Sequence, residues 1–374
     1  MAAASATSAE IAILPPSIVL ALAMMGDALI YAVLPVHAAA FGVSLVWVGL
    51  LLAANRLVRI FCNGWIVEIA RSAGARKVCI VGSVLAIVST AMLAFAPEEW
   101  SLLVARIMWG VAFAALNIMS FAYATAVPAQ SGRRLGIIRA TIGVVLSLTL
   151  TVGAWACGYF GPRGIFWVLA ICTLPALVIA LRLPDISLAD QKRRGLVLPM
   201  PGRTDLWAFA QGFAVDGVFL VTLAVLLRDH LRGMEPVLAA GIVLATRWLV
   251  EIVTAPIAGA MADRFGATRL VTILTMAMVG GFLTIAFGAI YPGAIAVTVV
   301  RGLTNTLGSA MVAERNPVNA VGAQSAYATW RDIGAAAGPI AAGLLAGFDP
   351  LFLFVGLATW MLLTIPMLAT AKTG

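Results

Sequence analysis

The sequence is poor in charged residues. Asp, Glu, Lys and Arg make up only 11% of its 374 residues, against about a quarter in soluble domains, and 62% of the residues are hydrophobic. The mean hydropathy is +1.04. This shortage excludes an ordinary soluble domain, and with it a basic domain that could bind nucleic acid. We predict an integral membrane protein whose main surroundings are the lipid bilayer.

Residue types that carry catalysis or bind metals are also scarce. The chain has two histidines and four cysteines, and no two cysteines form a CxxC pair. The sequence contains no Walker loop, no nucleophile elbow and no HExxH motif. We therefore expect no enzyme activity, no metal and no cofactor, and transport that is driven by a gradient in place of ATP.

Long apolar runs fill most of the chain. About twelve runs of helix length can be counted, and a helix of ~20 residues spans a bilayer core of ~30 Å. The loops between them alternate in charge, with Arg71, Arg76, Arg133 and Arg264 in loops of one set. Because basic loops stay in the cytoplasm, both termini are expected there, in a bacterial inner membrane. The fold class is thus an all-α polytopic membrane protein with twelve transmembrane helices.

Charged residues inside the apolar runs follow one rule of placement. They occur in the first, second, fourth, fifth, seventh, eighth, tenth and eleventh runs. The runs at 78–96, 164–180, 270–290 and 351–369 contain none. Since a charge in the bilayer core is costly unless it faces a cavity, eight helices are expected to line a central cavity and four to face lipid.

The two halves of the sequence resemble each other. Asp27 pairs with Asp216, Arg56 with Arg247 and Arg106 with Arg301, at offsets of 189, 191 and 195 residues. We predict two pseudo-symmetric six-helix bundles, at 1–183 and 204–374, with a cytoplasmic linker at 184–203.

Two motifs resemble those of the major facilitator superfamily. Residues 259–269 read GAMADRFGATR, close to the GxxxDRxGxR loop motif of that family, and residues 106–110 read RIMWG, similar to the RxxxG motif of its proton-coupled efflux members. The resemblance implies a secondary transporter that works by alternating access, with proton-coupled export of a small organic solute as the first reading. Asp27 and Arg106 are the candidates for proton coupling.

The charged residues of the loop motif suggest how it could stabilise a conformation. A carboxylate at a helix end that meets guanidinium groups forms a charge-assisted latch, and latches hold discrete conformations. The candidates are Asp263 with Arg264 or Arg269, and Glu68 with Arg76.

The sequence is compatible with more than one class of substrate. Seven arginines but four acids lie within the apolar runs, and this excess of positive charge favours an organic or inorganic anion that is bound by Arg56 and Arg247. A transporter-like receptor or assembly factor is a further alternative. For Glu251, an intrahelical pair with Arg247 competes with a role in binding. The candidate substrate-binding residues are Asp27, Tyr31, Arg56, Asn117, Asp216, Arg247, Trp248, Glu251 and Asn305. We expect a functional monomer that binds a small molecule and protons.

Overall fold

The computed structural model describes residues 12–96, 98–186, 188, 200–219, 222, 236–344 and 349–368. Within these ranges every regular element is helical. Nine helices there are long and apolar enough to cross a membrane. The expected linker at 184–203 lies mostly outside the described residues.

The N-terminal half is built from the helices up to α7. They are α1 (Leu14–Ala23), α2 (Met25–Val36), η1 (Ala38–Phe41), α3 (Leu45–Ala73), α4 (Ala75–Phe95), α5 (Glu99–Thr125), η2 (Pro128–Gln130), α6 (Ser131–Leu148), the π-helix η3 (Thr149–Gly153) and α7 (Ala154–Leu181). The stretch from Pro128 to Leu181 is 54 residues long, or ~80 Å at ~1.5 Å per residue, far more than one crossing needs. Gly161 breaks it with a φ of 75°, so it contains two crossings.

The C-terminal half begins at α8. Its elements are α8 (Arg203–Gln211), the π-helix η4 (Gly212–Phe219), α10 (Pro236–Phe265), α11 (Ala267–Ala286), α12 (Ile290–Arg315), α13 (Ala320–Leu344), α14 (Pro350–Leu362) and α15 (Ile365–Leu368). The segment α8–η4 and the 25-residue α13 correspond to the seventh and eleventh apolar runs. Together with the nine apolar helices and the second crossing near α7, they complete the polytopic helical fold that the sequence predicts.

Two glycines at matching positions end the second helix of each half. Gly74 lies between α3 and α4 with a φ of 89°, and Gly266 lies between α10 and α11 with a φ of 83°. Both values fall where L-residues with a side chain are disfavoured. The chain therefore turns in the same way in both halves.

The helices whose apolar runs contain no charge, α4, α7, α11 and α14, expose the apolar surface that is expected of lipid-facing helices. Large apolar side chains on these helices are exposed, among them Val81 on α4, Ile171 on α7, Ile273 on α11 and Phe352 on α14. Exposed apolar surface of this kind suits a lipid environment.

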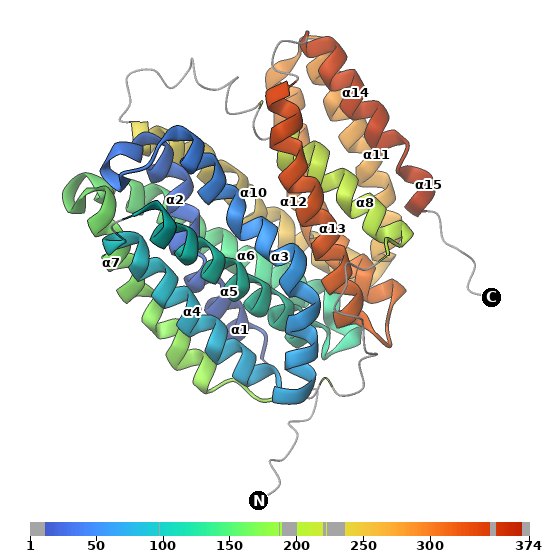
Figure 1. The fold of residues 1–374 in the computed structure, drawn as a ribbon. Helices are drawn as coiled ribbons and strands as arrows, with labels where there is room; N and C mark the ends of the chain where they lie inside the picture. The colour runs from blue at the N-terminus through green and yellow to red at the C-terminus, as the bar shows by residue number, and fades with distance from the viewer. Residues whose placement is uncertain are drawn as a thin grey trace, which may run out of the picture.

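The halves meet along two antiparallel helix pairs. In Figure 1, α10 lies alongside the N-terminal group of helices, while α8 and α11 to α15 gather on the other side. Along α6 and α10 the backbones touch at Gly132 with Gly259, at Gly136 with Ala255 and at Leu150 with Gly241. The second pair is α3 with α13. Below, the end of the bundle that carries the loops with Arg71, Arg133 and Arg264 is called the basic end.

Candidate functional site

Asp27 lies at the centre of a polar cluster in the N-terminal half. It is on α2, and its Oδ1 accepts hydrogen bonds from Arg106 Nη1 on α5 at 2.6 Å and from Asn55 Nδ2 on α3 at 3.2 Å. Arg106 also donates from Nε to the Leu51 carbonyl oxygen at 2.9 Å, and its side chain is only 2% exposed. The Tyr31 ring covers its guanidinium at 5.6 Å. Three helices are thereby tied together around one buried ion pair.

Asp216 holds the matching place in the C-terminal half. It lies in the π-helix η4, a distortion that is frequent at functional sites. Its Oδ1 accepts from Arg301 Nη2 at 2.5 Å, and its Oδ2 accepts from Arg331 Nη2 at 2.6 Å. Both carboxylate oxygens are thus paired with guanidinium groups. The pairs Asp27–Arg106 and Asp216–Arg301 join residues that the sequence repeat had placed at equivalent positions.

Glu251 does not pair with Arg247, the alternative that the i, i+4 spacing suggested. It is fully buried on α10, and its Oε1 accepts from Asn305 Nδ2 at 2.5 Å and lies 3.4 Å from Arg301 Nη1. Asn305 in turn accepts a hydrogen bond from Arg331. Glu251 therefore bonds to a neighbouring helix and not along its own, because α12 presents Arg301 and Asn305 one turn apart to α10.

Of the seven arginines within the apolar runs, three form no ion pair with a described acid. Arg56 donates from Nη1 to the Ala335 carbonyl oxygen on α13 at 2.7 Å. Arg247 lies 4.5 Å above the Trp248 ring, and its buried Nε has no described hydrogen-bond partner. The charges of Arg301, Glu251 and Asp216 act on it at longer range, and that of Arg56 in the other half acts on it more weakly. Arg139 on α6 is the third. These residues carry the positive excess that the sequence composition indicated.

Polar contacts also join the halves along α3 and α13. Arg59 Nη2 pairs with Asp332 Oδ1 at 2.7 Å, and Asn63 Nδ2 donates to Thr329 Oγ1 at 3.0 Å. With the bond from Arg56 to Ala335, they form a ladder from mid-membrane toward the basic end. This ladder was not predicted, because a bond to a backbone carbonyl or between neutral side chains leaves no signal in a single sequence.

Asp263 contacts the neighbouring half, but through other partners than expected. Its carboxylate accepts from the backbone N–H groups of Gly132 and Arg133, both at 2.8 Å, at the start of α6. Arg264 instead lies beside the Phe265 ring at 5.1 Å, and Arg269 is exposed. Backbone donors at a helix N-terminus attract a carboxylate through the helix dipole, so they replace the guanidinium groups.

The structure shows Glu68 with another partner than the expected Arg76. Glu68 pairs with Arg71 at 3.0 Å on the same helix. The backbone N–H of Arg76 donates to the carboxylate of Asp185, at the start of the expected linker, at 3.2 Å. The shorter intrahelical spacing of three residues explains the preference of Glu68.

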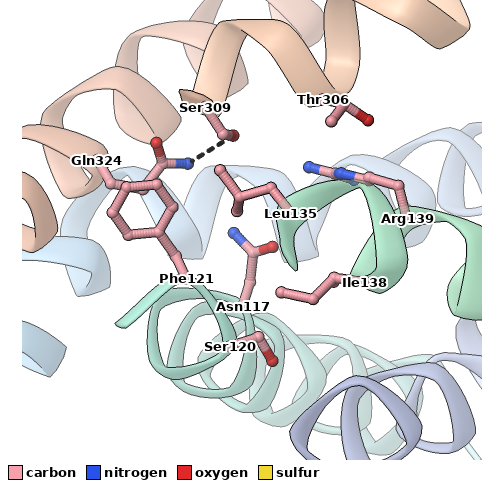
Figure 2. A pocket seen from close by; sticks show the side chains of 9 residues that line it. All are labelled: Asn117, Ser120, Phe121, Leu135, Ile138, Arg139, Thr306, Ser309 and Gln324. Atoms are coloured by element: carbon pink, nitrogen blue, oxygen red, sulfur yellow. Dashed lines mark hydrogen bonds between the residues drawn. The ribbon is translucent and has the colours of Figure 1, made fainter. Parts of the chain in front are cut away.

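Asn117 lines a small polar cavity between the halves. The cavity has a volume of about 20 Å³, room for one water molecule. Figure 2 shows Asn117 and Arg139 of the N-terminal half opposite Thr306, Ser309 and Gln324 of the C-terminal half.

A family model agrees with this architecture. The model described as Major Facilitator Superfamily matches residues 17–231, more than half of the chain. The chain belongs to the Major Facilitator Superfamily. As a member of this superfamily it is a membrane-embedded secondary transporter of a small molecule and not an enzyme.

A solved structure shares the superfamily fold. The human organic anion transporter MFSD10 (TETRAN) superposes with a TM-score of 0.74, over 96% of this chain and 99% of that chain, at 17% sequence identity. At that identity the likeness shows the fold alone. No curated protein sequence matches the chain significantly.

Proposed function

We propose that this transporter carries a small organic or inorganic anion by alternating access, and that Arg56 and Arg247 bind the anion between the two halves. The observation that carries the proposal is the division of charge in the described spans. The four acids within the apolar runs are all paired with arginines, whereas Arg56, Arg139 and Arg247 have no described acid within ion-pair distance. Guanidinium groups that remain without a carboxylate favour an oxyanion as ligand.

The positions of the two central arginines suit a ligand that couples to conformational change. Arg56 is on α3 in one half and Arg247 on α10 in the other, and the bond from Arg56 to Ala335 already crosses the interface. An anion between them would compete with that bond and change the contacts that hold the halves together. Only such differential contacts let a ligand shift the equilibrium between two states. The name of MFSD10 as an organic anion transporter is in keeping with this substrate class.

Proton coupling through Asp27 and Arg106 is a second proposal. The Asp27 side chain keeps 15% of its surface accessible, so a proton can reach a carboxylate that otherwise pairs with Arg106 at 2.6 Å. Protonation would weaken this pair and loosen α2 from α5. Asp27→Asn is expected to abolish transport driven by a pH gradient in proteoliposomes while it preserves the fold. Unchanged transport would remove Asp27 from the coupling.

Orientation, latching and oligomeric state complete the proposal. Both termini would lie in the cytoplasm of a bacterial inner-membrane protein, with the basic end inside. Asp263 would latch this end through the start of α6, with Glu68, Arg76, Arg264 and Arg269 contributing surface charge. The 1–183 and 204–374 bundles would move against each other within one monomer, and export remains the proposed direction.

A thermal-shift screen tests the substrate class. Detergent-solubilised protein would be heated with carboxylates, phosphates, organic cations and neutral metabolites, because a ligand that binds only the folded protein raises the melting temperature. We expect anions alone to give shifts. Arg56→Lys and Arg247→Lys each keep the charge but lose the bidentate fork, and each should weaken the binding of an active anion by more than about tenfold. Shifts that arise only with cations or neutral compounds would reject the anion proposal.

A further inference from the structure

Like Arg247, Arg139 forms neither an ion pair nor a hydrogen bond with a described residue, but Arg247 lies over the Trp248 ring and Arg139 over no described aromatic ring. Arg331 lies 192 residues further along the chain, at the equivalent position of the second half, and it shares Asp216 with Arg301. In the N-terminal half, by contrast, Asp27 pairs with Arg106 and leaves Arg139 aside. The symmetry between the halves is therefore broken at Arg139, whose guanidinium has no ion-pair or hydrogen-bond partner among the described residues and interacts with the charge of Glu251 only at longer range.

The surroundings of Arg139 are polar and rich in donors. Its guanidinium extends from α6 toward the space between α5 and α12 (Figure 2). The buried Thr306 hydroxyl has no hydrogen-bond partner, and the Asn117 amide bonds to no described residue. Ser309 accepts from Gln324 Nε2 at 3.3 Å, which leaves its own O–H free to donate. Donors that converge on a cation without a partner suit an oxygen of a carboxylate or phosphate group.

The depth of Arg139 follows from the pairing of α6 with α10. Gly143 contacts the backbone of Trp248, and Gly136 contacts that of Ala255. Arg139 therefore lies level with residue 252, five residues from Arg247 toward the basic end. At ~1.5 Å per residue the two arginines are separated by roughly 7 to 8 Å along the helix axis.

A second, larger cavity continues in the same direction. It has a volume of about 450 Å³, and Thr125, Ser131, Ala313 and Ala320 are among its lining residues. Asp263 and Glu314 also line it, and the carboxylates of both accept hydrogen bonds from backbone N–H groups. The first four of these residues lie on α5, α6, α12 and α13, each about one turn closer to the basic end than the lining of the Arg139 cavity. Arg139 thus lies between the central arginines and a wide opening on the same four helices.

We propose that Arg139 is an inner binding position for the carboxylate or phosphate group of the transported anion, reached from the basic end before the anion passes to Arg56 and Arg247. The inference rests on the proposed function for its ligand class. Thr306, Ser309 and Asn117 would supply the remaining hydrogen bonds. The narrowness of the cavity means that one oxygen fits in this conformation and that the rest of the anion enters when the helices separate.

Charge-selective thiol labelling tests this site without knowledge of the substrate. Asn117→Cys places a thiol beside Arg139, and Ala313→Cys places a control thiol in the larger cavity. Each detergent-purified variant is treated with a methanethiosulfonate that bears either a sulfonate or a trimethylammonium group, and labelling is followed by intact mass against the parent with its four native cysteines. We expect the thiol at 117 to favour the anionic reagent by roughly tenfold or more.

Variants of Arg139 decide the outcome. Arg139→Gln should remove the preference at 117, Arg139→Lys should keep it, and neither should change labelling at 313 substantially. Millimolar inorganic phosphate should slow labelling at 117 in the presence of Arg139 but not with Arg139→Gln. An unchanged preference with Arg139→Gln, or a thiol that neither reagent reaches, would overturn the inference. Normal anion binding by Arg56→Lys and Arg247→Lys would instead reject the proposed function and leave this result standing.

Discussion

At the scale of single residues, partner choice divides the arginines into two groups. Arg59, Arg106, Arg301 and Arg331 each bind a carboxylate. These pairs hold the structure together, since a buried charge without its partner is costly. Arg56, Arg139 and Arg247 have no such task in the described part of the chain, and this is why we assign them to the ligand.

This division of the arginines predicts that replacement by glutamine has opposite effects on stability in the two groups. Arg106→Gln leaves Asp27 without its cation in a largely buried site, and it should destabilise the protein by about 3 to 5 kcal/mol. Arg139→Gln removes a charge that has no described partner, and its effect on stability should be small or favourable. Melting temperatures in detergent measure both.

Asp27→Asn provides the control for this comparison. Combined with Arg106→Gln, it removes both charges of the pair and should recover part of the lost stability, as a double-mutant cycle of a true pair requires. Equal losses from Arg106→Gln and Arg139→Gln would contradict the division into structural and ligand-binding arginines.

At the scale of helices, close contact between α6 and α10 defines the observed conformation. A Cβ atom at Gly136 would lie 2.5 Å from the Ala255 carbonyl oxygen, closer than the helices allow. A Cβ atom at Gly49 on α3 would meet nothing within 4 Å. The two glycines therefore form a matched pair for testing the interface.

Gly136→Ala should weaken the contact and lower stability by about 1 to 3 kcal/mol, the usual cost of overpacking. Gly49→Ala should be neutral or stabilising by up to about 1 kcal/mol, because alanine is the better helix former. Thermal unfolding of both variants in one detergent shows whether each substitution lowers or raises stability. A stabilising Gly136→Ala would mean that α6 and α10 do not pack in this way.

Asp263 gives a prediction for the same helix. Asp263→Asn removes the charge that faces the N–H groups of Gly132 and Arg133, which should cost about 0.5 to 2 kcal/mol locally. Hydrogen exchange at the first turn of α6 should accelerate by roughly twofold to thirtyfold. Arg264→Gln, one residue further on, serves as control and should leave the exchange unchanged. Equal acceleration in both variants would show that a general disturbance of this helix end, and not the loss of the Asp263 cap, controls this turn.

At the scale of the whole molecule, the sequence predicts the fold more completely than it predicts the side-chain contacts. The placement of charges identified helices that expose apolar surface, and the repeat anticipated the equivalence of Asp27–Arg106 and Asp216–Arg301. The pairing of Glu251 with Arg301 and Asn305 was not predicted, because it depends on which helix faces α10. The cap of Asp263 could not be found either, since backbone N–H groups are present at every position.

The central claim is that one anion is held between the halves by Arg56 and Arg247. A double-mutant cycle tests it most directly, with dissociation constants of the best anion from the thermal-shift screen measured for the parent, Arg56→Lys, Arg247→Lys and the double variant. If both guanidiniums bind the same anion, each single change weakens binding by more than about tenfold, and the losses are non-additive by at least about 0.5 kcal/mol. Parent-like binding by both single variants, or strictly additive losses, would contradict the claim.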